Sequence, residues 1–230
     1  MSAAPRLSAA ARAAADAVNA HLVAADLAEL VRMRSVTGDE GAIQASLADW
    51  LEALGMTVEI FHPDPAAIRQ DPDWPGEEVA RTELPVVIGR AGRPGAFRLV
   101  LSGHVDVVPA GDPATWIGDA FGGEIREGRL YGRGSCDMKG GIAAIFGAVR
   151  ALGITGALDA LKGELVVALV PSEEDGGQGT LAAIRAGVTG DLCVIPEPTS
   201  LDVVVAHAGA ITFRLTVPGR AAHASQRTEG

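Results

Sequence analysis

The sequence has few cysteines, few aromatic residues and little positive charge. Its 230 residues include two cysteines, five Phe, three Trp and one Tyr, and 19 Lys and Arg stand against 29 Asp and Glu. Two scattered cysteines cannot build a disulfide framework in a chain of this size, which predicts a reducing, cytoplasmic location. The formal charge of −10 argues against a nucleic-acid partner, because neutralising phosphates requires clustered Lys and Arg.

Long apolar runs are also missing. No run approaches the roughly 18 residues that span a bilayer, so we expect no membrane partner. The alanine-rich start is interrupted by Arg6, Arg12 and Asp16, which leaves no continuous apolar core for a signal peptide. Apolar residues nevertheless make up 48% of the chain, enough to bury a sizeable core, and this content argues against a disordered or fibrous protein.

Helical and strand patterns alternate along the chain, with Asp39 as a predicted cap and Gly55 as a predicted stop for one helix. This alternation predicts an α/β fold, a layered α/β/α domain with a mostly parallel central sheet. The predicted helices are residues 9–31, 40–54, 141–152 and 179–186, and the predicted strands are residues 57–61, 85–89, 98–108, 164–170 and 192–195.

Other segments depart from this alternation. Residues 62–83, rich in Pro, Asp and Glu, predict a surface excursion, and residues 124–131 predict a short hairpin. Towards the end, residues 203–206 and 211–217 predict two strands with no helix between them. This change of pattern predicts a domain junction near residues 207–209.

Polar residues able to carry chemistry gather at the predicted ends of the strands, where open α/β sheets place their sites. The first cluster is SGHVDVVP at residues 102–109. Residues two apart in a strand point to the same side, so Asp106 lies beside His104 and can orient its imidazole. A carboxylate commonly orients a metal-bound histidine in this way. The alternative is a histidine that only forms a hydrogen bond at a strand end.

A second cluster is GRGSCDMKGG at residues 132–141, where the glycines allow tight turns. Asp137 lies just before a predicted helix, and a helix cap would explain it if it is taken alone. A phosphate loop is disfavoured, because neither GxxxxGK[ST] nor a GxGxxG after a strand is present. We expect Cys136 to be a small buried thiol rather than a nucleophile.

Two further clusters are rich in carboxylates. In PSEEDGG at residues 171–177, Glu173 and Glu174 are adjacent, which indicates either a solvated surface turn or a metal ligand next to a free base. In PEPT, Glu197 lies between two prolines. The four strand ends together supply a histidine and several carboxylates, a ligand set that zinc accepts. If Asp137 bridges, two metals about 3.5–4 Å apart could polarise a carbonyl and activate a shared water.

The four motifs, in this order and approximate spacing, resemble the zinc-dependent amidohydrolase family that includes acetylornithine deacetylase, succinyl-diaminopimelate desuccinylase, aminoacylase and the glutamate carboxypeptidases. The resemblance runs from about residue 20 to the last residue. It implies a hydrolase that cleaves the amide bond of a small N-acyl amino acid, with a carboxypeptidase or dipeptidase of the same family as the alternative. The implied cofactor is zinc, two per active site, with cobalt or manganese as substitutes.

The resemblance also implies a role for individual residues. His104, Asp137 and Glu197 would hold one zinc, and Asp137 would bridge to a second zinc held also by Glu174. Asp106 would orient His104.

Two further catalytic roles follow from the same resemblance. Glu173 would be the general base, taking a proton from the attacking water and delivering it to the leaving amine. His223, in PGRAAHAS, would reach the active site of a partner subunit and stabilise the tetrahedral oxyanion.

The family pattern assigns residues 1–208 to the N-terminal part of the catalytic domain and residues 209–230 to the start of a small α+β lid and dimerisation domain. In the family a further histidine after the lid binds the second zinc, and none follows here. We therefore expect a fragment of a longer enzyme that is a homodimer in its full-length form. The 230-residue form could be inactive or poorly folded. The alternative from another class is a non-catalytic binding module that retains the fold.

Overall fold

The computed structural model describes residues 7–95 and 97–206, together with Gly209, Phe213, Leu215, Thr216, Pro218 and Ser225. Residues up to Pro198 form one compact unit, and residues from Thr199 onwards belong to a second. The helices and strands named below all lie in the first unit. Among the described residues, no helix is both long enough and apolar enough to cross a membrane.

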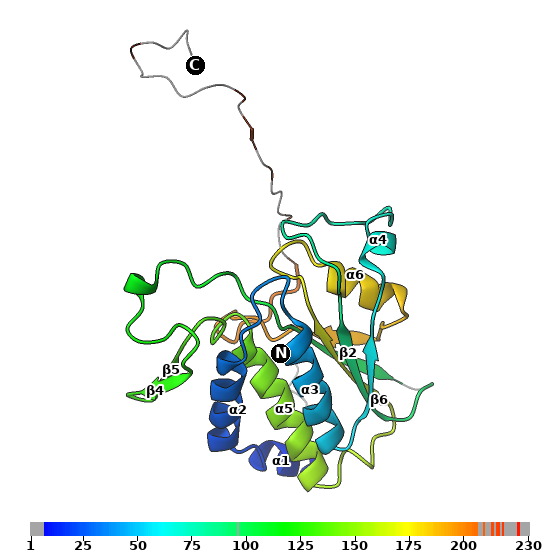
Figure 1. Ribbon diagram of the computed structural model, residues 1–230. Helices are drawn as coiled ribbons and strands as arrows, with labels where there is room; N and C mark the ends of the chain where they lie inside the picture. Colours follow the sequence, from blue (N-terminus) through cyan, green and yellow to red (C-terminus); the bar gives the residue numbers. More distant parts are fainter. Residues whose placement is uncertain are drawn as a thin grey trace. The chain divides into compact units, whose positions relative to one another are not determined.

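A five-stranded sheet in the order β1-β2-β6-β3-β7 forms the centre of the first unit (Figure 1). Strand β2 pairs antiparallel with both β1 and β6, whereas β3 pairs parallel with β6 and β7. Four strands therefore run in one direction and only β2 opposes them, which confirms the predicted mostly parallel sheet. The strands are β1 (Thr57–Phe61), β2 (Val86–Gly92), β3 (Arg98–His104), β6 (Glu164–Val170) and β7 (Leu192–Val194), and a separate hairpin pairs β4 (Glu124–Arg126) with β5 (Arg129–Tyr131).

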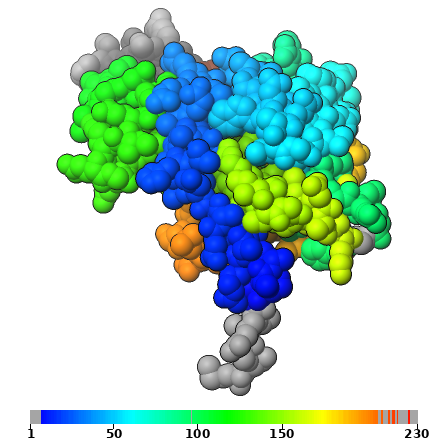
Figure 2. All heavy atoms as spheres, turned by 90° about the horizontal axis from the view of Figure 1, so that it is seen from below, coloured from blue at the N-terminus to red at the C-terminus, as the bar shows by residue number. Residues whose placement is uncertain are grey.

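Helices cover both faces of the sheet. On one face, α5 packs against α2 and α1, and α3 packs against β1 and β2. The N-terminal helices and α5 are seen together in Figure 2. The other face is covered by α6, with α4 beside it. The helices are α1 (Ala9–Asp16), α2 (Ala20–Arg32), α3 (Gly41–Ala53), α4 (Pro65–Ile68), α5 (Lys139–Ile154) and α6 (Gln178–Arg185), and Pro113–Thr115 forms a 3-10 turn.

Strand β6 shows how the sequence produces these layers. All seven of its residues are buried, as expected of a strand covered on both faces. Alternate side chains point to opposite faces of a sheet. Leu165, Val167 and Leu169 accordingly pack in the core beneath α3 and α5, and Val166 and Val170 pack in the core beneath α6. This arrangement confirms the predicted α/β/α order of layers.

The N-terminal helical prediction was wrong in one respect, because two helices replace the single helix expected over residues 9–31. Helix α1 ends at Asp16, and α2 begins after Asn19. The Asn19 side chain accepts hydrogen bonds from the N–H groups of His21 and Leu22, which starts a new helix within the apolar periodicity. Two apolar residues near this break, Val18 and Leu22, are exposed.

Other boundaries also differ from expectation. Glu40, and not Asp39, occupies the cap position of α3, whereas Gly55 follows the end of that helix with a φ of 87°. Strand β3 ends at His104, whereas the predicted strand extended to residue 108. The segment 203–206 is not a strand, and much of 211–217 lies outside the described residues.

Candidate metal centre

The end of β3 provides a buried histidine next to a buried aspartate. The side chain of His104 is 1% exposed and that of Asp106 is fully buried. The Nδ1 atom of His104 lies 2.9 Å from the main-chain oxygen of Asp106 and 3.6 Å from its carboxylate. Because the main-chain oxygen can only accept, Nδ1 carries the proton of this hydrogen bond. This leaves Nε2 of His104 facing away from Asp106 and available as a ligand.

The Asp106 carboxylate also holds the turn that follows β6. The Glu173 N–H donates to Oδ1 at 3.1 Å, and the Glu174 N–H donates to Oδ2 at 3.2 Å. The Thr37 hydroxyl donates to Oδ2 at 3.3 Å. Asp106 therefore connects the histidine at the end of β3 with the two glutamates of a turn nearly 70 residues further along the chain.

The loop before α5 brings Asp137 to the histidine. The Nε2 atom of His104 lies 3.0 Å from Asp137 Oδ1. Asp137 does not cap α5, because Met138 occupies the cap position and no side-chain cap bond forms. The peptide bond between Asp137 and Met138 is cis. Because its carboxylate lies against Nε2 of His104 and makes no cap bond, Asp137 is directed to the site and not to the helix.

Glu197 reaches the same site from the segment after β7. Its Oε1 atom lies 3.8 Å from Nε2 of His104. A close contact between backbones makes this possible, because a Cβ atom at Gly141 would lie 2.2 Å from the main-chain oxygen of Pro196. Only glycine at this position in the first turn of α5 lets the Glu197 segment approach the Asp137 loop.

Ligand atoms of His104, Asp137 and Glu174 all lie within 4.8 Å of one another. They come from the end of β3, the loop before α5 and the turn after β6. Zinc binds such nitrogen and oxygen atoms at about 2.0–2.2 Å, and the exposed Asp137 side chain has room to rotate towards an ion. This cluster is the candidate metal centre.

The charges around His104 favour its protonated form. Burial acts to lower its pKa, but the neighbouring Asp106 carboxylate and the charges of Glu173 and Glu197 raise this pKa to about 10. Burial raises the pKa of Asp106, yet His104 and the two N–H donors of the turn lower it overall. Without a cation, the imidazole is therefore a cation itself, opposite an ionised Asp106.

The carboxylates of the cluster repel one another. Burial raises the pKa of Glu174, and the charge of Asp137 raises it further against the opposing effect of His104. Burial also raises the pKa of Glu197, where His104 again opposes and Asp137 adds to the shift. A divalent cation would remove this repulsion, so the donor set fits a metal ion.

Sequence reasoning singled out residues that the structure brings together and one that it does not describe. His104, Asp106, Asp137, Glu174 and Glu197 converge, and Glu173 lies on the same turn with an exposed side chain; His223 lies outside the described residues. The expectation that Cys136 is buried was wrong, because its thiol is exposed.

Lys139 is a supporting residue to which the sequence assigned no role. It is fully buried, and its Nζ donates to the main-chain oxygens of Leu30 at 2.9 Å and Met33 at 2.8 Å. These oxygens lie at the end of α2, so Lys139 ties the Asp137 loop to that helix. Burial lowers the pKa of Lys139 to about 8. No local pattern indicates this role, because its partners are more than 100 residues away.

A mostly parallel α/β sheet that brings a histidine and carboxylates together at its strand ends is the arrangement of a metal-dependent enzyme site. The family model described as peptidase family M20/M25/M40 matches residues 100–226. The chain therefore belongs to this family of hydrolases.

Individual relatives agree with this assignment. The chain is 36% identical over 208 residues to a succinyl-diaminopimelate desuccinylase of Gluconacetobacter diazotrophicus, which covers 85% of this chain and 49% of the relative. The chain thus spans about half the length of the curated relatives it matches.

Solved structures share the fold. Human carnosine dipeptidase 1 superposes with a TM-score of 0.62 at 22% identity, covering 83% of this chain and 41% of that chain. An M20 family metallo-carboxypeptidase from Sulfolobus solfataricus gives a TM-score of 0.58 at 18% identity, covering 76% and 37%.

Proposed function

We propose that this chain carries the larger part of a two-zinc centre that hydrolyses the amide bond of a small N-acyl amino acid. His104, Asp137 and Glu197 would hold one zinc, and Asp137 would be shared with a second zinc that Glu174 would also bind. Cobalt or manganese could replace zinc, since the ligands are nitrogen and oxygen atoms that these metals also accept.

The observation that carries the proposal is the convergence of ligand atoms from His104, Asp137 and Glu174. Three chain segments far apart in the sequence place these atoms within 4.8 Å of one another. The neighbouring buried Asp106 accepts hydrogen bonds from two of these segments. Its main-chain oxygen accepts from Nδ1 of His104, and its carboxylate accepts from the N–H groups of the glutamate turn. A surface turn with chance acidic neighbours would not need such a buried connection.

Each of these residues has a separate role in the proposed reaction. Zinc, when bound, polarises the substrate carbonyl and lowers the pKa of a water. Glu173, whose side chain is exposed beside Glu174, accepts a proton from the attacking water at its carboxylate and then delivers it to the leaving amine nitrogen. Asp106 holds His104 in the tautomer that leaves Nε2 free. His223 of a partner subunit would stabilise the oxyanion.

The substrate proposal comes from the relatives. The similarity to the desuccinylase named above favours a small N-acyl amino acid, of the kind cleaved by acetylornithine and succinyl-diaminopimelate deacylases. The named dipeptidase and carboxypeptidase share the fold, so a peptide bond is the second candidate. Because the chain spans about half of those relatives, the substrate, the homodimer and the cytoplasmic location are proposals for the whole protein.

A substitution at the proposed base tests the mechanism. In the protein that carries this chain, Glu173→Ala should lower kcat by at least a hundredfold while bound zinc is unchanged, because Glu173 moves a proton and does not bind metal. Turnover of N-succinyl and N-acetyl amino acids and zinc content would both be measured. Glu52→Ala, on the exposed side of α3, is the matched control and should change neither.

Two outcomes would contradict the proposal. Turnover undiminished in Glu173→Ala would remove Glu173 as the base. A native protein that holds no zinc would favour the alternative of a non-catalytic binding module.

A further inference from the structure

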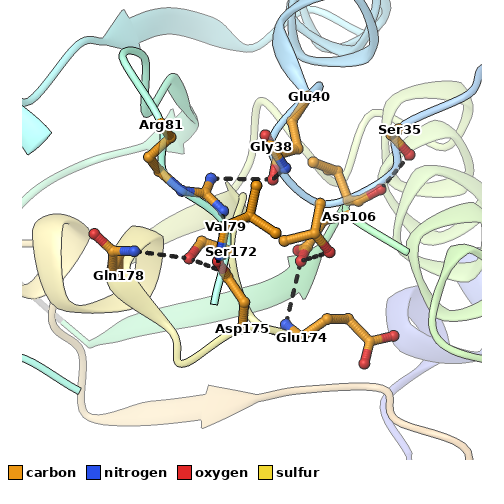
Figure 3. Close-up of polar contacts among 12 residues, drawn as sticks. Ser35, Gly38, Glu40, Val79, Arg81, Asp106, Ser172, Glu174, Asp175 and Gln178 are labelled. Atoms are coloured by element: carbon orange, nitrogen blue, oxygen red, sulfur yellow. Dashed lines mark hydrogen bonds and ion pairs between the residues drawn. The ribbon is translucent and has the colours of Figure 1, made fainter. Parts of the chain in front are cut away.

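Arg81 lies at the end of the segment predicted to be a surface excursion, yet its side chain is only 1% exposed. Its guanidinium joins two carboxylates of different elements (Figure 3). One nitrogen donates to Glu40 Oε1 at 3.1 Å, and another donates to both oxygens of Asp175, at 3.0 and 3.1 Å. The partners are themselves 2% and 3% exposed. No local sequence pattern predicts a role for any of the three residues.

Asp175 belongs to the same turn as the two glutamates of the metal centre. The Ser172 hydroxyl donates to Asp175 Oδ1 at 2.5 Å, and the Val79 N–H donates to Oδ2 at 3.3 Å. Ser172 has a φ of 69°, a left-handed conformation that a residue other than glycine adopts at a cost. The Asp175 carboxylate, which Arg81 holds, is the group that fastens this strained turn.

Glu40 binds the other nitrogen of the Arg81 guanidinium and connects it to the loop after α2. The Gly38 N–H donates to Glu40 Oε1 at 3.0 Å. The next residue back, Thr37, donates its hydroxyl to Asp106, which in turn accepts the N–H groups of Glu173 and Glu174. These contacts form a closed ring. It runs from Arg81 through Glu40 and the 37–40 loop to Asp106, and from Asp106 back through the glutamate turn and Asp175 to Arg81.

The ring holds Glu174 from its backbone side. In Figure 3 the Glu174 N–H points towards Asp106, and its carboxylate points away from the ring. Two contacts hold this turn: Asp106 accepts the N–H of Glu174 at its first half, and Arg81 binds Asp175 at its second. Arg81 supplies the only charge of opposite sign that the described contacts of Asp175 contain.

We infer that Arg81 is a positioning residue of the metal centre, which fixes the Glu174 carboxylate by clamping the 172–175 turn to the 37–40 loop. This inference rests on the proposed role of Glu174 as a metal ligand. The described contacts of Arg81 include no oxygen of a proposed metal ligand, so it acts on metal binding through the turn.

Zinc titration of the chain tests this role. Arg81→Met should weaken zinc binding at least tenfold, measured by competition with a chromogenic chelator, because the Glu174 carboxylate is no longer held towards the site. Arg81→Lys retains the charge but cannot donate to Glu40 and to both Asp175 oxygens from a planar fork, so we expect a loss of about threefold. Arg185→Met is the matched control: Arg185 also joins two aspartates, Asp71 and Asp73, but at the exposed surface, and zinc binding should stay unchanged.

A double-mutant cycle separates positioning from a general structural effect. In the Glu174→Ala background, Arg81→Met should cause no further loss of zinc affinity beyond about twofold, because its target is already gone. Losses that add, or native-like zinc binding in Arg81→Met, would overturn the inference.

Folding and the proposed function are checked in the same series. Circular dichroism and urea unfolding establish that each variant is folded at the assay conditions. If Arg81→Met does not fold, Arg81→Lys decides, and native-like zinc binding in that variant overturns the inference. If His104→Ala and Glu174→Ala also bind zinc like the native chain, the proposed metal centre itself has failed.

Discussion

The two halves of the metal centre are built differently. On one side, the side chains of His104 and Asp106 are 1% and 0% exposed, and Asp106 binds both the His104 ring and the glutamate turn by hydrogen bonds. On the other side, the side chains of Asp137 and Glu197 are 57% and 33% exposed. The protein's own hydrogen bonds therefore fix the side-chain positions of the buried half, whereas the exposed half presents carboxylates that a bound ion would hold in place.

The largest expected difference between the halves is in folding stability without metal. Asp106→Ala should lower the free energy of unfolding by about 2–4 kcal/mol, because two N–H groups of the turn lose a buried acceptor and the His104 ring loses the carboxylate 3.6 Å from its Nδ1. Asp137→Ala should change it by less than about 0.5 kcal/mol, as is usual for exposed substitutions. Urea unfolding in the presence of a chelator measures both. Equal costs would contradict the contrast between a buried and an exposed half.

A smaller effect is expected beneath the exposed half. Lys139→Met should cost about 1–3 kcal/mol, because two main-chain oxygens at the end of α2 lose their buried donor. The pH dependence has a definite sign. Because burial lowers the pKa of Lys139 to about 8, the unfolded chain binds a proton that the folded chain does not, between pH 8 and the unfolded pKa of about 10.4.

Folding stability due to Lys139 should therefore increase with pH across that window. The gap in unfolding free energy between the native chain and Lys139→Met should be larger at pH 10 than at pH 7.5. Urea titrations of both proteins at the two pH values give this gap. A gap that narrows as the pH rises would show that the buried lysine is stabilised in its charged form.

Much of the fold was predictable from local patterns. The bounds of β1 and β6 were predicted correctly, since a short alternating run and a continuous apolar run are direct signatures of strands. The turn between β4 and β5 was likewise predictable from Glu127 and Gly128, both of which have positive φ values. The break between α1 and α2 was missed, because Asn19 acts as a cap within an apolar pattern that continues on both sides.

The site was predictable to the extent that its residues lie in compact motifs. His104, Asp137, Glu174 and Glu197 each stand at the end or beginning of a predicted element, and parallel strands bring such ends together. The supporting residues were not predictable. Arg81 meets Glu40 and Asp175 at separations of 41 and 94 residues, and no local pattern distinguishes a buried arginine in a segment rich in Pro, Asp and Glu.

The central claim is that strand ends of this chain form a metal site, and zinc content tests it most directly. After incubation with zinc and dialysis, the native chain and Glu52→Ala should retain the ion, and His104→Ala should lose it, because the nitrogen ligand of the described cluster is gone. Metal analysis by mass spectrometry gives the number of ions per chain. A native chain without zinc, or a His104→Ala variant that retains as much as the native chain, would contradict the account.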